Sequence, residues 1–221
     1  MVLTPSTMLP LGTPLPAFSL EQVAGERPVQ AEAPQRWSTA HLGPEPVLVL
    51  FLCAHCPFVK HIEPELSRLE RDYGERIQIV AISSNSTLTH PQDGPEGLRA
   101  QAERCGWRFP YLFDADQTVA RAFQAACTPD LFLFGAAGQA SATAGPDSSG
   151  GNGCRDSVGS DPGSTHQLVY RGQLDASRPG NDQPLDGRDL RAALEALLAG
   201  HPVSPEQTPS IGCNIKWHPD G

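Results

Sequence analysis

Two cysteines stand three positions apart in the stretch FLCAHCPFVKH, which covers residues 51–61. Cys53 directly follows the apolar run of residues 47–52, and Cys56 is directly followed by Pro57. A pair at this spacing can close a reversible disulfide, hold a metal ion or form a permanent structural bridge. Since the thiolate is the species that attacks a disulfide, the chemistry depends on what stabilises a negative charge on one of the two sulfurs.

The segments on either side predict where the pair lies in the fold. The continuous apolar run at 47–52 predicts a buried central strand. After Pro57, apolar residues recur every three or four positions and predict a helix of about four turns. They are Val59, Ile62, Leu66, Leu69 and Tyr73. Pro64 lies inside this pattern and predicts a kink in the helix.

This placement predicts different roles for the two sulfurs. Cys53 is expected where the free N–H groups and the dipole of the following helix stabilise an anion, which lowers the thiol pKa. Cys56 is expected one turn later, more deeply buried and near enough to close a disulfide with Cys53. We therefore expect Cys53 to attack a substrate and Cys56 to resolve the mixed disulfide.

The remaining segments predict one α/β domain over residues 1–200. Further strands are expected at 77–83, 131–134 and 168–171, and helices at 95–105, 117–123 and 187–199. Strand, helix and strand in succession predict a right-handed parallel crossover. A Gly- and Ser-rich insertion at 135–166 is predicted to be disordered, and residues 201–221 are predicted to form an extended tail.

Several stretches of the chain carry a family resemblance. They are LPLGTPLPAFSL (9–20), FLCAHCPFVKHIEPEL (51–66), AISSN (81–85), FPYLFD (109–114), CTPDLFLF (127–134), YRGQLDASRPGN (170–181) and PSIGCNIKW (209–217). With them, the chain resembles the thioredoxin superfamily, in the branch of redoxin proteins related to the alkyl hydroperoxide reductase (AhpC/TSA) group. The resemblance implies a thioredoxin-like fold, with a central mixed sheet of four to five strands flanked by helices. It also implies a thiol-disulfide oxidoreductase in which Thr128 and a cis Pro129 face the substrate.

The expected topology places two loops beside the cysteine pair. If strands 47–52 and 77–83 run parallel, the loops at 84–94 and 173–182 flank the pair, and the insertion lies at the opposite end. Asn85, Asp175 and Arg178 are then candidates to shape the site, although each also fits an ordinary turn or a solvated loop.

Three further side chains are candidates to assist the pair. A protonated His55 would stabilise a Cys53 thiolate and make the disulfide more oxidising. Cys127 precedes the Thr-Pro step and fits either a third redox thiol or a core residue. Cys213 lies in the tail, whose extended reach past Gly200 is about 40 Å, so it fits either a relay thiol or a packed residue.

Two other functions compete with disulfide exchange. A peroxiredoxin-like peroxidase keeps Thr or Ser three positions before its reactive cysteine, but here Leu50 precedes Cys53 and Cys53 precedes Cys56 at that distance. A metal-binding module would use Cys53, Cys56 and either His55 or His61 as ligands. For the main prediction, a thiol-disulfide oxidoreductase, we expect no metal ion and no cofactor.

The composition limits the partners. A net charge of −9 and a pI of about 5.2 argue against binding to nucleic acid or to an anionic membrane. No run approaches the roughly 20 apolar residues that cross a bilayer, and the Pro-interrupted start does not read as a signal peptide. We therefore expect a cytoplasmic protein that meets disulfide-bearing proteins or small molecules and a thiol electron donor.

Overall fold

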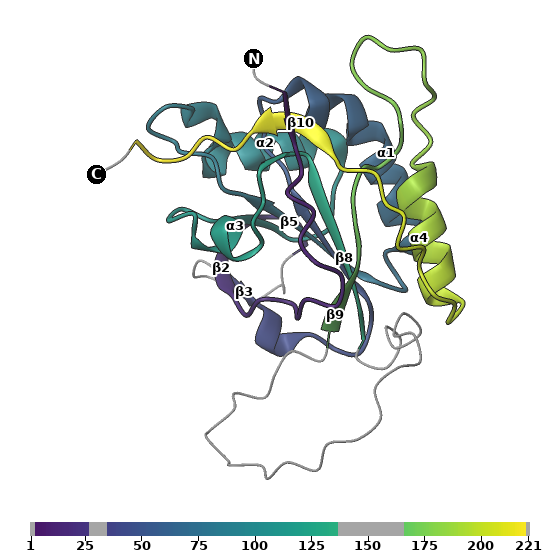
Figure 1. The fold of residues 1–221 in the computed structure, drawn as a ribbon. Coiled ribbons are helices and arrows are strands. Elements are labelled where there is room, and N and C mark those ends of the chain that lie inside the picture. Colours follow the sequence, from purple (N-terminus) through teal and green to yellow (C-terminus); the bar gives the residue numbers. More distant parts are fainter. Residues whose placement is uncertain (1–2, 27–34, 137–165, 220–221) are drawn as a thin grey trace.

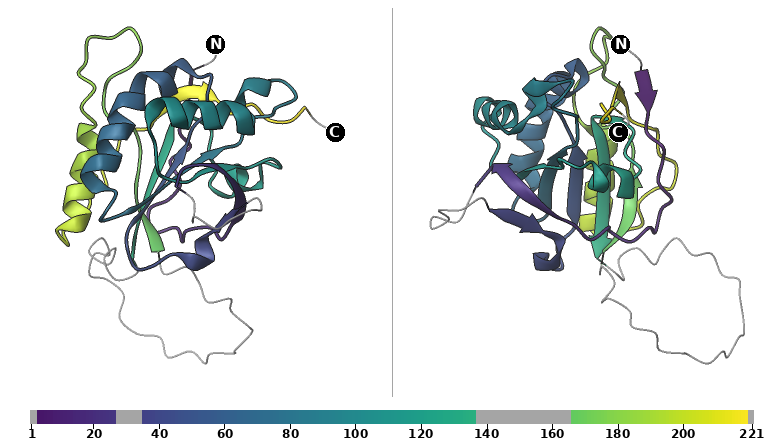
Figure 2. Two further views of the ribbon diagram at one scale, coloured as in Figure 1. Left: turned by 180° about the vertical axis from the view of Figure 1, so that it is seen from behind. Right: turned by 90° about the vertical axis from the view of Figure 1, so that its left-hand side faces the viewer.

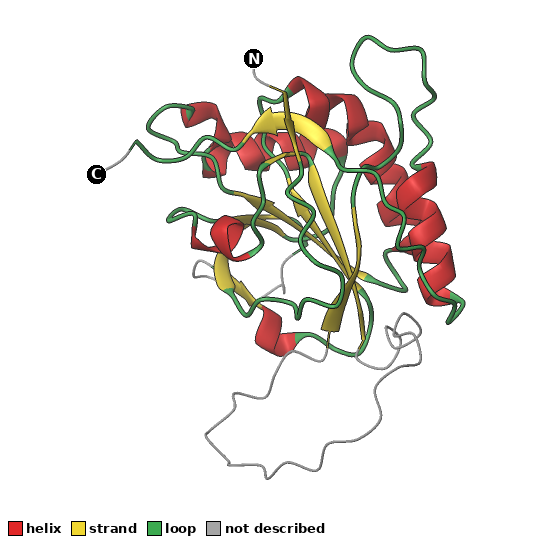
Figure 3. Cartoon of the chain, viewed as in Figure 1, coloured by secondary structure: helices red, strands yellow, loops and turns green. Residues whose placement is uncertain are grey.

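The computed structural model describes residues 3–26, 35–136 and 166–219. Its centre is a seven-stranded mixed sheet in the order β3-β2-β6-β5-β4-β8-β9 (Figures 1 and 3). The predicted α/β architecture with helices around a mixed sheet is confirmed, but the sheet is wider than the four to five strands expected. The strands that the sequence did not predict, β6, β2 and β3, lie together toward one edge of the sheet, where no long apolar run marks them in the sequence. Two of them, β6 and β3, have only three residues each.

The strand before the cysteine pair is an interior strand of the sheet. All five residues of β4 (Val47–Phe51) are buried, as its continuous apolar sequence predicts. It runs parallel to β5 (Gln78–Ser83) and antiparallel to β8 (Asp130–Ala136), which forms a hairpin with β9 (His166–Arg171). On the other side, β5 pairs in parallel with β6 (Tyr111–Phe113), followed by the antiparallel strands β2 (Ser19–Ala24) and β3 (Arg36–Ser38).

Helices cover both faces of this sheet (Figure 2). One core contains the inner residues of α1 (Pro57–Tyr73), α2 (Pro95–Cys105) and α4 (Arg188–Leu198) against every second residue of β4. The opposite core contains α3 (Thr118–Ala122) and the alternate residues of β4. Two short 3-10 helices, η1 (Thr39–His41) and η2 (Pro91–Asp93), lie in loops. The helix α1 continues through Pro64 and keeps the predicted apolar stripe buried.

A second, three-stranded sheet brings the two ends of the chain together. The C-terminal strand β10 (Ile211–Asn214) lies between β1 (Leu3–Pro5) and β7 (Cys127–Thr128), antiparallel to both. In Figure 1, β10 is the yellow arrow that crosses between the N-terminal strand and the helices α1 and α2. The C-terminal segment therefore returns to the end of the main sheet that carries the cysteine pair.

Two sequence-based expectations concern regions at the margins of the structure. Residues 137–165 of the predicted insertion lie outside the described residues, while β8 and β9 extend to meet at the Ala136 and His166 pair. The division into a domain at 1–200 and a tail at 201–221 stays a prediction. Within the described ranges, no helix is both long and apolar enough to cross a membrane.

Candidate active site

The cysteine pair lies in the turn between the central strand and the first long helix. The chain leaves β4 after Phe51, and Cys56 is the residue that caps the N-terminus of α1, with Pro57 in its first turn. Both Cys53 and Cys56 have exposed fractions of 0%. The pair is thus positioned as predicted at the junction of strand and helix, but it is sealed from solvent.

A buried carboxylate holds this turn in shape. Asp93 Oδ1 accepts hydrogen bonds from the backbone N–H groups of Ala54 at 2.9 Å and His55 at 3.1 Å. Its Oδ2 lies 2.5 Å from His55 Nδ1 and accepts from Asn85 Nδ2 at 2.8 Å. Burial raises the pKa of Asp93, but the hydrogen bonds from His55 and Asn85 outweigh it and leave the pKa below its ordinary value.

The helix N-terminus acts on Cys56 rather than on Cys53. A hydrogen bond from the Cys53 thiol lowers the pKa of Cys56; burial opposes this, and the Cys213 thiol and the Val59 N–H lower the pKa further, to about 5. The predicted lowering for Cys53 is therefore wrong in this structure. Because Cys56 is the N-cap residue of α1, the Val59 N–H in the first turn acts on its sulfur.

The Cys53 thiol keeps its proton more strongly than an ordinary thiol. Its hydrogen bond to Cys56, its burial and the nearby Asp93 carboxylate all raise its pKa, and only the Thr128 hydroxyl at 3.3 Å acts in the opposite direction. His55 was predicted to stabilise a Cys53 anion, but its Nδ1 faces Asp93, and this carboxylate favours the neutral thiol. The surroundings of the pair therefore favour an anion on Cys56 over one on Cys53.

Thr128 and Pro129 lie against both cysteines, and their peptide bond is cis as predicted. The Thr128 Oγ1 atom contacts the Cys53 sulfur, and the Thr128 carbonyl oxygen lies 3.3 Å from the Cys56 sulfur. The backbone edge of Thr128 was expected to face a substrate. In the structure it already pairs with Cys213 of β10.

The two candidate auxiliary cysteines have different surroundings. Cys213 is 2% exposed, and its sulfur lies 2.8 Å from that of Cys56. Burial and the hydrogen bond to Cys56 raise the pKa of Cys213 to about 12. Cys127 is fully buried with its sulfur 3.5 Å from the Pro129 carbonyl oxygen, and burial followed by the Asp130 carboxylate raises its pKa. The contact with Cys56 belongs to Cys213, while Cys127 has the environment of a core residue.

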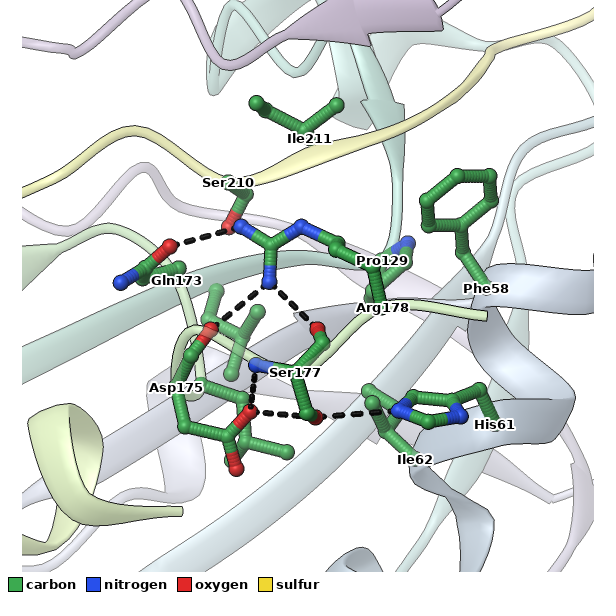
Figure 4. A pocket seen from close by; sticks show the side chains of 12 residues that line it. Phe58, His61, Ile62, Pro129, Gln173, Asp175, Ser177, Arg178, Ser210 and Ile211 are labelled. Atoms are coloured by element: carbon green, nitrogen blue, oxygen red, sulfur yellow. Dashed lines mark hydrogen bonds between the residues drawn. The ribbon is translucent and has the colours of Figure 1, made fainter. Parts of the chain in front are cut away.

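Of the two loops predicted to flank the pair, loop 84–94 contacts the cysteine turn, and loop 173–182 lies beside the neighbouring Pro129. Loop 84–94 supplies Asn85 and Asp93, as described above. Loop 173–182 forms one wall of a pocket next to Pro129, with Phe58 and His61 of α1 on the other side (Figure 4). The guanidinium group of Arg178 lies in this wall, where it donates to the carbonyl oxygens of Asp175 and Ser177 and to the side chain of Gln173.

The potential metal ligands differ from those expected. Among the described residues, donor atoms of Cys53, His55 and Asp93 lie within 4.8 Å of one another. His61 instead contacts the hydroxyl of Ser177 at 3.0 Å and is not part of this group. Both oxygens of Asp93 already accept hydrogen bonds that hold the turn, so this cluster reads first as a structural network around the thiols.

Sequence reasoning missed Asp93 altogether. It lies 38 residues from His55 in sequence, inside a stretch that reads as an ordinary loop, HPQDGPEG. The available signal was the expected position of loop 84–94 beside the pair, together with a carboxylate in that loop.

Comparisons with known proteins agree with this architecture. The sequence profile of the AhpC/TSA family matches residues 11–142. An uncharacterized conserved protein from Geobacillus kaustophilus has a similar structure, with a TM-score of 0.80 and 38% identity over 100% of this chain and 99% of that one. A hypothetical protein from Sinorhizobium meliloti gives a TM-score of 0.77 and 35% identity over 97% and 98% of the two chains.

A more distant likeness concerns the fold alone. A putative thiol:disulfide interchange protein from Chlorobium tepidum gives a TM-score of 0.53 at 13% identity, with 86% of this chain and 99% of that one covered. The predicted thioredoxin-like fold is confirmed. No curated protein matches the chain.

Proposed function

Since this chain belongs to the AhpC/TSA family, within the thioredoxin superfamily, we propose that it exchanges thiols and disulfides, with Cys53 and Cys56 as the redox couple. One arrangement carries the proposal: Cys56 is the residue at the N-terminus of α1, and the hydrogen bond from the Cys53 thiol lowers the pKa of its own thiol to about 5. This arrangement holds a nucleophilic thiolate at neutral pH beside a partner that can displace it from a mixed disulfide.

The order of events follows from the charge. The Cys56 thiolate attacks one sulfur of a substrate disulfide, the substrate S–S bond breaks, and the departing thiolate takes up a proton. Cys53 then loses its proton and attacks Cys56, which releases the second substrate thiol and closes the Cys53–Cys56 disulfide. A thiol electron donor returns the pair to its reduced form. These roles reverse those expected from the sequence, because the hydrogen bonds from Cys53, Cys213 and the Val59 N–H favour the anion at Cys56.

The first test is the attack itself. At pH 6 the aromatic disulfide DTNB should react first at Cys56, because only Cys56 is ionised there. The adduct should persist for mapping by mass spectrometry in Cys53→Ser/Cys213→Ser, which lacks both thiols that could displace it. Cys56→Ser should react at least about 100-fold more slowly at this site. An adduct that forms first on Cys53 would contradict the assigned order.

The second test is turnover of a protein disulfide. The wild type should reduce insulin with dithiothreitol as donor, and Cys56→Ser should abolish this activity. Cys105→Ser is the matched control, since the Cys105 thiol on α2 is partly buried with its pKa raised to about 11. Wild-type protein that forms no Cys53–Cys56 disulfide in a glutathione redox buffer would refute the proposal.

A thiol-dependent peroxidase is the second candidate. The low pKa of Cys56 favours it too, because a thiolate also attacks peroxides and passes to a sulfenic acid. Neither Cys56 nor Cys53 has the Thr or Ser three positions earlier that peroxidatic sites keep, so we rank this activity below disulfide exchange. Hydrogen peroxide turnover with a thiol donor, measured beside insulin reduction, separates the two activities.

The partners follow from the same chemistry. We propose disulfide-bearing proteins or small molecules as substrates and a thiol as electron donor, with Pro129 and the adjoining pocket as the substrate-facing surface. A cytoplasmic location stays a prediction, which cell fractionation would test.

A further inference from the structure

The C-terminal strand occupies the position where an extended substrate was expected. β10 pairs antiparallel with β7, and Cys213 lies opposite Thr128, beside the cysteine pair. A bound peptide that adds a strand to this edge would present its own cysteine at the same place. The chain thus carries an internal segment with a cysteine at the substrate position.

The close approach of β10 depends on a glycine. A Cβ atom on Gly212 would lie 2.1 Å from the Thr128 carbonyl oxygen, a distance that no side chain tolerates. Only glycine lets the strand lie this near to β7, and the next residue along the strand is Cys213.

Other contacts fix β10 in this place. On one side it pairs with β1, where Leu3 lies opposite Cys213, and the Ser6 N–H donates to the Ser210 carbonyl oxygen at 2.8 Å. On the other side, the Lys216 N–H donates to Asn85 Oδ1 at 2.8 Å. Asn85 also binds Asp93, which shapes the cysteine turn, so β10 and the turn share one hydrogen-bonded network.

From this geometry we infer that Cys213 is a third redox thiol, which β10 presents to Cys56 as an internal substrate. The Cys56 sulfur is in contact with Cys213 at 2.8 Å and accepts a hydrogen bond from Cys53. A disulfide can join Cys56 to either neighbour, but not to both at once. Cys56 is the sulfur that both bonds share.

The exchange between the two disulfides needs no external oxidant. Starting from the Cys53–Cys56 disulfide, the Cys213 sulfur attacks Cys56, the S–S bond to Cys53 breaks, and the bond between Cys56 and Cys213 forms. The proton that Cys213 loses is taken up at the released Cys53 sulfur. One disulfide and one thiol are present before and after, so the step balances. The same attack on a Cys56 mixed disulfide releases the bound substrate thiol.

This inference rests on the proposed redox role of Cys56, and the first experiment separates the two. Oxidation of the Cys53→Ser protein with diamide should link Cys56 to Cys213, giving joined tryptic peptides 37–60 and 192–216 in non-reducing mass spectrometry. A Cys53→Ser/Cys213→Ser protein should lack this species. If Cys53→Ser keeps both thiols alkylatable, or links Cys56 elsewhere, the third-thiol role is overturned. The proposed function fails only if the wild type also lacks its Cys53–Cys56 disulfide.

The second experiment follows the fate of a mixed disulfide. After DTNB reaction, Cys53→Ser should release the bound aromatic thiol through Cys213, while Cys53→Ser/Cys213→Ser should retain the adduct at least about tenfold longer. Cys53→Ser/Cys127→Ser is the matched control and should release it as fast as Cys53→Ser. Equal retention with and without Cys213 would overturn the inference.

A third variant tests β10 without removing a thiol. Gly212→Ala should force β10 away from Thr128, lower the yield of the Cys56–Cys213 link at least about fivefold, and speed alkylation of Cys56 by iodoacetamide. Circular dichroism distinguishes a displaced β10 from an unfolded protein. Cys213→Ser is the control that keeps Gly212 and the strand intact but cannot form the Cys56–Cys213 link. An unchanged yield in Gly212→Ala would count against presentation by β10.

Discussion

At the scale of single residues, the candidate active site favours a negative charge on one of its two sulfurs. Hydrogen-bonded contacts with Cys53, with Cys213 and with the Val59 N–H lower the pKa of Cys56. The buried carboxylate of Asp93, by contrast, raises the pKa of Cys53. Interactions that favour the anion therefore converge on one sulfur, and those that disfavour it converge on the other. Two predictions belong to this scale.

The first concerns pH and stability. The reduced Cys56 thiol has a folded-state pKa of about 5, below the 9.0 of an unfolded thiol, so the unfolded chain binds more protons between these values. This group's contribution to stability is full above about pH 9 and is lost as pH falls toward 5. Urea unfolding with a phosphine reductant should show that the stability difference between wild type and Cys56→Ser grows from pH 5 to pH 8. A difference that is constant with pH would place the charge elsewhere.

The second concerns the carboxylate under the turn. Asp93→Asn removes a negative charge near Cys53, so the Cys53 pKa should fall, as followed by the pH profile of its alkylation. The buried hydrogen bonds it disturbs should cost about 1–3 kcal/mol of unfolding free energy. Asp182→Asn, an exposed position on the 173–182 loop, is the control and should change neither. An unchanged Cys53 pKa in Asp93→Asn would contradict the proposal that Asp93 raises it.

At the scale of elements, the position of the nucleophile depends on how α1 is docked. Glu65 on α1 is 1% exposed and pairs with Arg191 of α4 at 2.7 Å and with Arg68 in its own helix. Arg191 also pairs with Asp72 at 2.9 Å, so one guanidinium joins two turns of α1 to α4. The helix that begins after Cys56, α1, is thus held to α4 by ion pairs as well as by its apolar stripe.

Removing this guanidinium should loosen the contact between the helices. Arg191→Ala leaves Glu65 with Arg68 as its only ion-pair partner among the described residues. We expect the free energy of unfolding, measured with guanidinium chloride as denaturant, to fall by about 2 kcal/mol. Arg188→Ala, three residues earlier on α4, removes only an exposed pair with Asp186 and should leave the midpoint unchanged. If both variants unfold alike, the buried network does not stabilise the docking of α1.

At the scale of the whole molecule, the cysteine pair lies near one end of β8, and Ala136 and His166, the described residues that flank the insertion, lie at the other. β4 delivers the cysteines at its carboxyl end, while β8 starts there and runs away to Ala136, where it meets His166. Replacing residues 137–165 with an Asn-Gly turn should keep insulin reduction within about twofold, because the hairpin already pairs at this point. It should also raise stability by about 1–2 kcal/mol through a smaller loop-closure cost, measured by urea unfolding. A large loss of activity would connect the insertion to the site.

Much of this architecture was predictable where the pattern is long and local. The run at 47–52 and the apolar stripe from Val59 to Tyr73 each define an element by themselves, and Pro57 marks the start of α1. Short strands such as β6 and β3 carry too few residues for a period, so they form only because neighbouring strands pair with them. The sheet was therefore predicted too narrow.

The site divides in the same way. The cysteine spacing and the reach of Cys213 follow from local sequence and chain length, and the place of Thr128 and Pro129 follows from the family resemblance. The location of the charge does not, because it depends on which residue caps α1 and on Asp93, a distant partner of the turn. The spacing of the cysteines does not determine which thiol has the lower pKa. That depends on contacts with residues distant in sequence, which form only when the chain folds.

The contact between Cys213 and Cys56 also determines how the protein would behave under oxidative stress. A group tethered in place acts at an effective concentration in the millimolar range or above, so it competes with the small thiols of a cell. Capture of a damaged Cys56 sulfur would be unimolecular, with a rate independent of how much protein is present. Fast capture by Cys213 would leave an oxidised Cys56 little time to form a disulfide with a second molecule or to be oxidised to irreversible states.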